Sequence, residues 1–178
     1  MSVMVGVKHR GRIAVASDSR WTSGWDHQSN ALPKVVKRGS FLLTVGPTAG
    51  FEQALWEEVL ALAEREPDWP AKWARHCLSG PNESVMRRLA EKHEEPIIVA
   101  WAGRLLALRA TGSIFETADG IATCGCGGDF ARGAAILYRA LRPASSARGI
   151  AVRGVEVAIE CDAGCAGPVV VREMAAPA

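Results

Sequence analysis

The stretch that decides the fold is 2–20, which runs Ser2-Val3-Met4-Val5-Gly6-Val7-Lys8-His9-Arg10-Gly11-Arg12-Ile13-Ala14-Val15-Ala16-Ser17-Asp18-Ser19-Arg20. Apolar residues alternate or cluster through 3–8 and again through 13–18, as they do in half-buried β-strands. Between them, Arg10-Gly11-Arg12 is typical of a tight turn. The stretch therefore predicts an antiparallel β-hairpin.

The remaining chain alternates between groups of strands and groups of helices. We predict a loop over 21–32 and further strands, the first two joined around Gly39, over 34–37, 41–45, 97–101, 105–109, 120–124 and 168–174. A glycine-rich turn, 46–50, separates the early strands from the first helix. Helical spacing or capping residues predict helices over 51–65, 67–77, 82–93 with Asn82 as N-cap, 130–141, and from Ser145 or Ser146 to 159.

The order of these elements predicts an α+β fold. Two antiparallel sheets with helices packed outside them would bury all the apolar faces, as a four-layer αββα sandwich. A doubly wound parallel fold needs a regular β-α alternation that the first four strands lack. With 178 residues the chain is long enough for one well-buried domain, so we expect a single domain over 1–178.

Composition and charge exclude several classes of function. The net charge of +2 is too small for a nucleic-acid-binding footprint, so no nucleic-acid partner is expected. No export signal precedes the first strand, and no apolar stretch approaches the roughly 20 residues that a membrane span needs. We therefore expect a soluble, cytoplasmic protein without a membrane partner.

The five cysteines are an odd number in a chain without an export signal, which favours reduced thiols. Cys124-x-Cys126 and Cys161-x₃-Cys165 are weak zinc signals, because the first pair has a single spacer and neither pair has a histidine nearby. We expect neither a metal nor a cofactor. Phosphate binding at Gly125-Cys126-Gly127-Gly128, before a helix, is a minor alternative, since the Lys-Ser/Thr ending of a P-loop is missing.

Ser2 is the first candidate for chemistry. Once the initiator Met1 is removed, Ser2 carries a hydroxyl and a free α-amine, which are a nucleophile and its own base in one residue. Asp18 follows sixteen residues after Ser2, and Lys34 follows sixteen residues after Asp18, each at the end of a predicted segment. Each residue alone is most simply a terminus, a turn or a solvated strand end. Their combination with two glycine-rich turns predicts a catalytic site.

These motifs resemble those of the proteasome β-subunit family in its HslV-like bacterial form. The members of this family are N-terminal-nucleophile hydrolases. The resemblance extends from Ser2 to about Glu173, without a gap in the first fifty residues. It places Ser2 on the nucleophilic threonine, Asp18 on the catalytic aspartate, and Lys34 on the catalytic lysine. Gly46-Pro47-Thr48-Ala49-Gly50 matches the turn that forms the oxyanion hole.

The resemblance also implies supporting residues near the α-amine. Gly125-Cys126-Gly127-Gly128 is similar to the family's Gly-Ser-Gly-Gly motif, and Asp162-x-x-Cys165 is similar to its Asp-x-x-Ser motif. More faintly, Thr22 matches a residue that binds the substrate backbone. Positions that line the pocket for the side chain before the cleaved bond are matched by Trp21, Val36 and Gly46, with Gly50 also assigned to substrate binding.

The implied chemistry is hydrolysis of a peptide bond. An α-amine has a reference pKa of about 7.7 to 8.0, so part of it is neutral near pH 7 and can accept the Ser2 proton. The Lys34 ammonium would lower the pKa of both the amine and the hydroxyl, and Asp18 would keep Lys34 charged. The Thr48 N–H would stabilise the oxyanion, a donor worth roughly 3 to 4 kcal/mol in related acyl-transfer sites.

Three positions depart from the family's pattern. Ser2 replaces a threonine, so the nucleophile lacks the methyl group that restricts its rotamer, and we expect a slower enzyme. Cys126 and Cys165 replace serines, and thiols are weaker hydrogen-bond partners. Thr48 replaces a glycine, which reduces backbone freedom in that turn.

The resemblance implies an endopeptidase enclosed in stacked rings of identical subunits. Twelve or fourteen subunits would form the rings, with fourteen preferred, and an ATP-driven unfoldase would supply unfolded protein or peptide substrates. Two alternatives stay open. The chain could be a catalytically weak or inactive ring-forming scaffold of the same fold, or an amidohydrolase that acts on small amides.

Overall fold

The computed structural model describes residues 2–23, 26–29, 33–44, 49–80, 83–92 and 95–176. Its strands are β1 (Met4–His9), β2 (Arg12–Ser17), β3 (Arg20–Ser23), β4 (Asp26–Ser29), β5 (Val35–Arg38), β6 (Phe41–Thr44), β7 (Ile97–Trp101), β8 (Arg104–Leu108), β9 (Ile114–Glu116), β10 (Ile121–Cys124) and β11 (Val170–Ala175). Its helices are α1 (Ala49–Arg65), α2 (Trp69–Ser79), α3 (Glu83–Lys92), α4 (Gly128–Leu141) and α5 (Ala147–Cys161).

The opening hairpin forms the centre of a four-stranded antiparallel sheet with the order β10-β1-β2-β11. Strands β1 and β2 pair along their whole length. The turn between them places Arg10 at φ 50° and Gly11 at φ 70°, a left-handed pair that closes two-residue hairpins. The predicted hairpin and its turn are confirmed.

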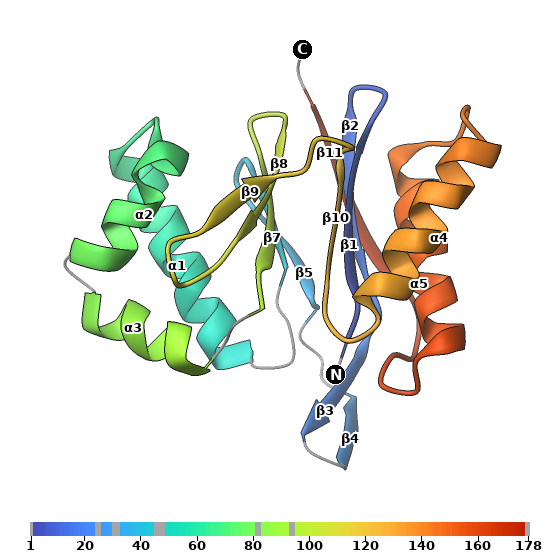
Figure 1. Cartoon of the computed structure of the whole chain (residues 1–178), viewed down its shortest axis with the longest axis horizontal. Helices are drawn as coiled ribbons and strands as arrows, with labels where there is room; N and C mark the ends of the chain where they lie inside the picture. Colours follow the sequence, from blue (N-terminus) through green and yellow to red (C-terminus); the bar gives the residue numbers. More distant parts are fainter. Residues whose placement is uncertain are drawn as a thin grey trace.

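A second antiparallel sheet has the order β5-β6-β7-β8-β9. The two sheets lie face to face, with α1, α2 and α3 outside the second sheet and α4 and α5 outside the first, as Figure 1 shows. The predicted α+β class and four-layer αββα sandwich are therefore confirmed.

Each interface between layers has its own apolar core. The core between the two sheets includes Met4, Val15, Leu42 and Ile98. The sheets approach so closely that a Cβ on Gly6 would lie 2.7 Å from Leu105 Cδ1. A side chain at position 6 would therefore require Leu105 to move.

Three local expectations were wrong. The predicted loop 21–32 contains a separate hairpin, β3 paired with β4, whose polar residues carry no alternation that would reveal a strand. Strand β9 was missed, because its three residues sit at the edge of the sheet with partly or fully exposed side chains. Gly50 belongs to the first turn of α1 and not to the turn before it.

Most other boundaries agree with the predicted ones to within a few residues. Ser146 is the N-cap of α5, because its hydroxyl accepts a hydrogen bond from the Gly149 N–H at 3.1 Å. The proposed N-cap Asn82 lies outside the described residues. In the described part of the chain, no helix combines the length and apolar character required to span a membrane.

Candidate active site

The opening hairpin brings Ser2 and Asp18 together. Ser2 lies just before β1 and Asp18 just after β2, and the pairing of Met4 with Ser17 holds these two strand ends side by side. The Asp18 N–H extends the pairing by donating to the Val3 carbonyl at 3.3 Å. Lys34 arrives from the second sheet, directly before β5. The site therefore lies where one end of the first sheet meets one end of the second sheet.

The three side chains form one hydrogen-bonded cluster. Lys34 Nζ donates to Ser2 Oγ at 2.5 Å and to Asp18 Oδ1 at 2.8 Å. Ser2 Oγ in turn donates to Asp18 Oδ1 at 2.7 Å. Lys34 Nζ also donates to the Arg20 carbonyl. The ammonium is thus positioned to stabilise negative charge on the Ser2 oxygen.

This cluster is removed from solvent. Ser2 and Asp18 are 0% exposed and Lys34 is 1% exposed. Burial lowers the pKa of Lys34, since it penalises the charged form, while the Asp18 carboxylate acts in the opposite direction. At such a site the energy of each ion pair and hydrogen bond is larger than in water.

Backbone groups hold Asp18 in place. The Val3 N–H donates to Asp18 Oδ1 at 3.1 Å, and the Ala166 N–H donates to Asp18 Oδ2 at 3.3 Å. Ala166 belongs to the turn after α5. The Ala166 carbonyl also accepts hydrogen bonds from the Ser19 and Arg20 N–H groups. Both carboxylate oxygens therefore have fixed donors, and the carboxylate is oriented toward Ser2 and Lys34.

The turn before α4 holds the backbone of Ser2. The Gly127 N–H donates to the Ser2 carbonyl at 3.3 Å, and Cys126 Sγ accepts from the Ser2 N–H at 3.2 Å. Gly125 has φ +88°, and a Cβ there would lie 2.2 Å from the Ser2 carbonyl oxygen. This position requires glycine for both conformation and space.

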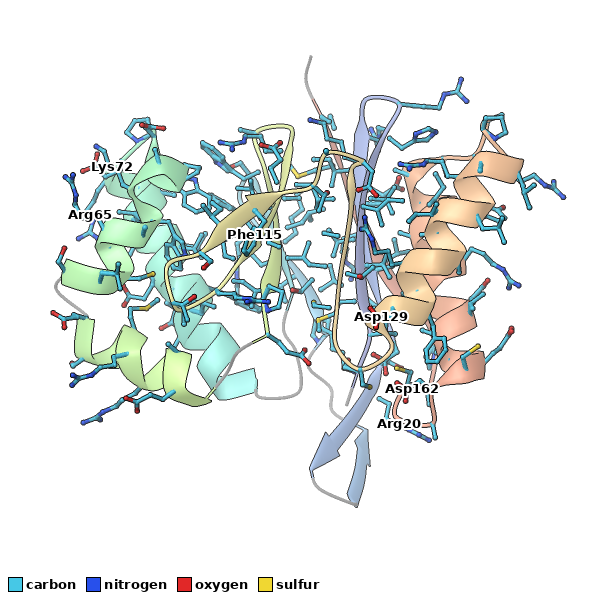
Figure 2. The ribbon with its side chains drawn as sticks, in the orientation of Figure 1. Arg20, Arg65, Lys72, Phe115, Asp129 and Asp162 are labelled. Atoms are coloured by element: carbon cyan, nitrogen blue, oxygen red, sulfur yellow. The ribbon has the colours of Figure 1, made fainter. Side chains whose placement is uncertain are left out.

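The turn after α5 completes the surroundings of the Ser2 nitrogen. Asp162 ends α5, and its Oδ1 accepts from the Gly164 N–H at 2.7 Å. Figure 2 shows Asp162 and Arg20 at the same end of the molecule, near the N-terminus labelled in Figure 1. Cys165 is buried in this turn, and its Sγ lies 3.9 Å from Cys126 Sγ.

Both thiols have a raised pKa, mainly because burial penalises the thiolate. The Asp162 carboxylate raises the pKa of Cys126 further, and neighbouring negative groups do the same for Cys165. The thiols are therefore protonated near neutral pH, where they act as weak hydrogen-bond partners and not as nucleophiles.

Six of the predicted site residues converge in the structure: Ser2, Asp18, Lys34, Cys126, Asp162 and Cys165. Thr48 and Gly46 lie outside the described residues, as do the side chains of Trp21 and Thr22, whose backbone belongs to β3. Val36 is half-buried on β5 and packs against the core outside the second sheet.

Two contributors were missed by sequence reasoning. The Arg20 carbonyl accepts from Lys34, and the Ala166 N–H donates to Asp18. Both are backbone groups, so their residue types carry no signal. Only the glycine that follows, Gly167 at φ +84°, marks a constrained turn at that point of the chain.

The arrangement suits nucleophilic catalysis by a hydroxyl. A buried ammonium contacts the hydroxyl oxygen, a fixed carboxylate orients the ammonium, and the nitrogen of the same serine donates to Cys126 Sγ. Such a site stabilises an alkoxide and leaves the backbone nitrogen of Ser2 as the adjacent proton acceptor if it becomes a free amine.

Comparison with known proteins finds relatives that cover most of the chain. No protein-family model matches the chain. The ATP-dependent protease subunit HslV of Brevibacillus brevis is 26% identical over 162 residues, which cover 89% of this chain and 88% of that protein. The ATP-dependent protease subunit HslV of Ligilactobacillus salivarius is 24% identical over 184 residues, covering 98% and 100%.

Solved structures share the fold over nearly the whole chain. HslV from Trypanosoma brucei superposes with a TM-score of 0.80 at 20% identity, covering 97% of this chain and 99% of that one. Thiobacillus denitrificans BPH in complex with epoxomicin superposes with a TM-score of 0.77 at 19% identity, covering 99% and 100%.

Proposed function

We propose that the nucleophile of this chain is Ser2, freed by removal of Met1. The proposal starts from the likeness of the chain to HslV, which makes it an HslV-like member of the proteasome β-subunit family and a protease of that N-terminal-nucleophile type. The observation that carries the proposal is the 2.5 Å contact between Lys34 Nζ and Ser2 Oγ inside a buried cluster. A buried lysine that contacts a hydroxyl oxygen has a clear chemical use in activating it. The proposed unit is one proteasome-type domain over 1–178.

In the proposed reaction, the free α-amine of Ser2 accepts the hydroxyl proton while Oγ attacks the carbonyl carbon of a peptide bond. The Lys34 ammonium stabilises the charge on Oγ, and Asp18 holds the ammonium in position. The amine then passes its proton to the leaving nitrogen as the C–N bond breaks. Water hydrolyses the resulting ester and regenerates Ser2.

Removal of Met1 has one chemical role in this proposal. It converts the Ser2 amide nitrogen, which cannot accept a proton, into an amine that can. Cys126 Sγ, 3.2 Å from the Ser2 nitrogen, would then help to orient the new amine.

The remaining roles follow the resemblance. We assign the oxyanion-hole donor to the Thr48 N–H, and substrate binding to Trp21, Thr22, Val36, Gly46 and Gly50. We also propose assembly into stacked rings of twelve or fourteen subunits that receive unfolded protein from an ATP-driven unfoldase. The relatives' name, ATP-dependent protease subunit, supports the dependence on ATP and the association with other subunits.

The test compares wild type, Ser2→Ala and the matched control Ser84→Ala, in which an exposed helix serine is replaced. Intact mass first establishes whether Met1 is absent. Cleavage of an unfolded protein is then followed with its fluorescent fragments. We expect cleavage by wild type and Ser84→Ala and at least about a thousandfold loss in Ser2→Ala, the scale for a lost nucleophile.

Two outcomes would overturn the proposal in favour of the alternatives. A folded wild type without Met1 that cleaves nothing would indicate an inactive scaffold. Ser2-dependent hydrolysis of small amides, without cleavage of unfolded protein, would indicate an amidohydrolase. Cleavage that survives in Ser2→Ala would show that the nucleophile is another residue.

A further inference from the structure

Beside the proposed nucleophile, two thiols and a carboxylate converge from different parts of the chain. Cys126 lies in the turn before α4, whereas Asp162 and Cys165 lie in the turn after α5. One ligand atom from each, two Sγ atoms and a carboxylate oxygen, all lie within 4.8 Å of one another. The family resemblance placed these three residues near the α-amine, and the structure shows that their ligand atoms also lie close to one another.

The spacing of the atoms matches the requirements of a tetrahedral metal. Two sulfurs bound to zinc at about 2.3 Å with tetrahedral angles lie roughly 3.8 Å apart. Cys126 Sγ and Cys165 Sγ are 3.9 Å apart. The two sulfurs therefore have nearly the separation that one tetrahedral ion requires, and the Asp162 carboxylate lies within 4.8 Å of both.

Access and charge also favour a cation here. Cys126 is exposed, so an ion can reach the cluster from solvent, whereas Cys165 is buried. Asp162 belongs to no ion pair among the described residues, although its Oδ1 accepts from the Gly164 N–H. No side-chain cation among the described residues therefore competes with a metal for this carboxylate.

We propose that Cys126, Cys165 and Asp162 form a binding site for a thiophilic divalent cation, zinc in the first place. Two thiolates and one carboxylate are a donor set that suits zinc and leaves a fourth position open. The Ser2 nitrogen lies 3.2 Å from Cys126 Sγ, so the free α-amine of the mature chain would occupy that position.

Binding is coupled to protons. Each thiol loses its proton to form a metal–sulfur bond, so one zinc ion displaces about two protons from the thiols.

Occupancy of the site has a consequence for activity, and this part rests on the proposed function. An α-amine whose lone pair is bound to zinc cannot accept the Ser2 proton. Zinc would therefore inhibit the peptidase reversibly, and a chelator would restore activity. Metal binding itself is measured without any substrate, so its failure and a failure of the proposed peptidase activity are distinguishable.

The test uses the full chain, purified without a polyhistidine tag and kept under reductant. Zinc binding is measured by calorimetry in buffers of different ionisation enthalpy, and cobalt(II) serves as a spectroscopic probe. We expect one ion per chain, release of about two protons from the thiols, and an intense cobalt spectrum with a thiolate charge-transfer band. An octahedral cobalt spectrum without that band would overturn the proposal.

Variants locate the ligands. Cys126→Ser and Cys165→Ser should each weaken zinc binding by more than about tenfold, while Cys161→Ser, at an exposed cysteine outside the cluster, should bind as wild type does. Thermal unfolding checks that each variant is folded. Equal zinc affinity in wild type and the Cys126→Ser/Cys165→Ser double variant would refute the site, and the wild-type cobalt spectrum decides the question if the variants do not fold.

Discussion

Lys34→Met should destabilise the protein by about 3 to 5 kcal/mol, the cost of removing one partner of a buried ion pair. The substitution keeps the length of the side chain but removes the ammonium that contacts Ser2 Oγ and Asp18 Oδ1. Asp18 is 0% exposed, so its carboxylate would remain buried without a cation. For a chain of this size, the loss corresponds to a fall in Tm of about 6 to 20 °C.

The assay is urea unfolding at pH 7, followed by the fluorescence of the six tryptophans. Asp18→Asn/Lys34→Met completes a double-mutant cycle. We expect this double variant to lose at least about 2 kcal/mol less unfolding free energy than the two single variants lose together, because it leaves no buried charge unpaired. Lys72→Met is the matched control, since its partner Glu66 is on the surface and the pair is exposed. If the Lys34→Met variant is as stable as the Lys72→Met variant, the argument that Asp18 needs a buried cation is refuted.

Three further predictions concern the backbone, the pH dependence and the sheet interface. Gly125→Ala should lower the free energy of unfolding by roughly 1 to 3 kcal/mol and abolish cleavage, because φ is +88° at this position and the new Cβ would meet the Ser2 carbonyl. Wild-type activity in this variant would contradict the assigned geometry. Activity should rise with pH as the α-amine loses its proton and fall again as Lys34 loses its own. Because burial lowers the pKa of Lys34, the alkaline fall should begin below pH 10.5. A pH–rate profile that stays flat to pH 11 would count against the role of Lys34. Gly6→Ala should lower stability by about 1 to 3 kcal/mol, since its Cβ would lie 2.7 Å from Leu105 Cδ1 and 2.9 Å from Ile98 Cγ2. An unchanged unfolding midpoint would show that these two side chains move aside without cost.

Strong periodicity made most of the fold predictable. The apolar residues of β1 and β2 and the turn at Gly11 specified the hairpin, and the hairpin alone is enough to bring the ends that carry Ser2 and Asp18 together. The hairpin of β3 and β4 was not predictable in this way, because its sequence lacks the apolar alternation that marks a strand.

The candidate site was predictable only in part. Charged and nucleophilic side chains such as Lys34 carry a signal in the sequence, and the family resemblance placed them in register. The support from the Ala166 N–H carries none, since any residue type has that group. The family resemblance assigned Cys126 and Cys165 to the site, but the 3.9 Å approach of their sulfurs follows from the packing of two turns that are 39 positions apart.

The central claim is that Ser2, once exposed as the first residue, is the nucleophile. The most direct measurement is tandem mass spectrometry of the N-terminal peptide after treatment of the purified protein with a peptide epoxyketone. We predict that the peptide begins at Ser2 and carries one inhibitor on that residue, and that Ser2→Ala is not labelled. A wild-type protein that cleaves substrate while it retains Met1, or that is labelled at another residue, would contradict the account.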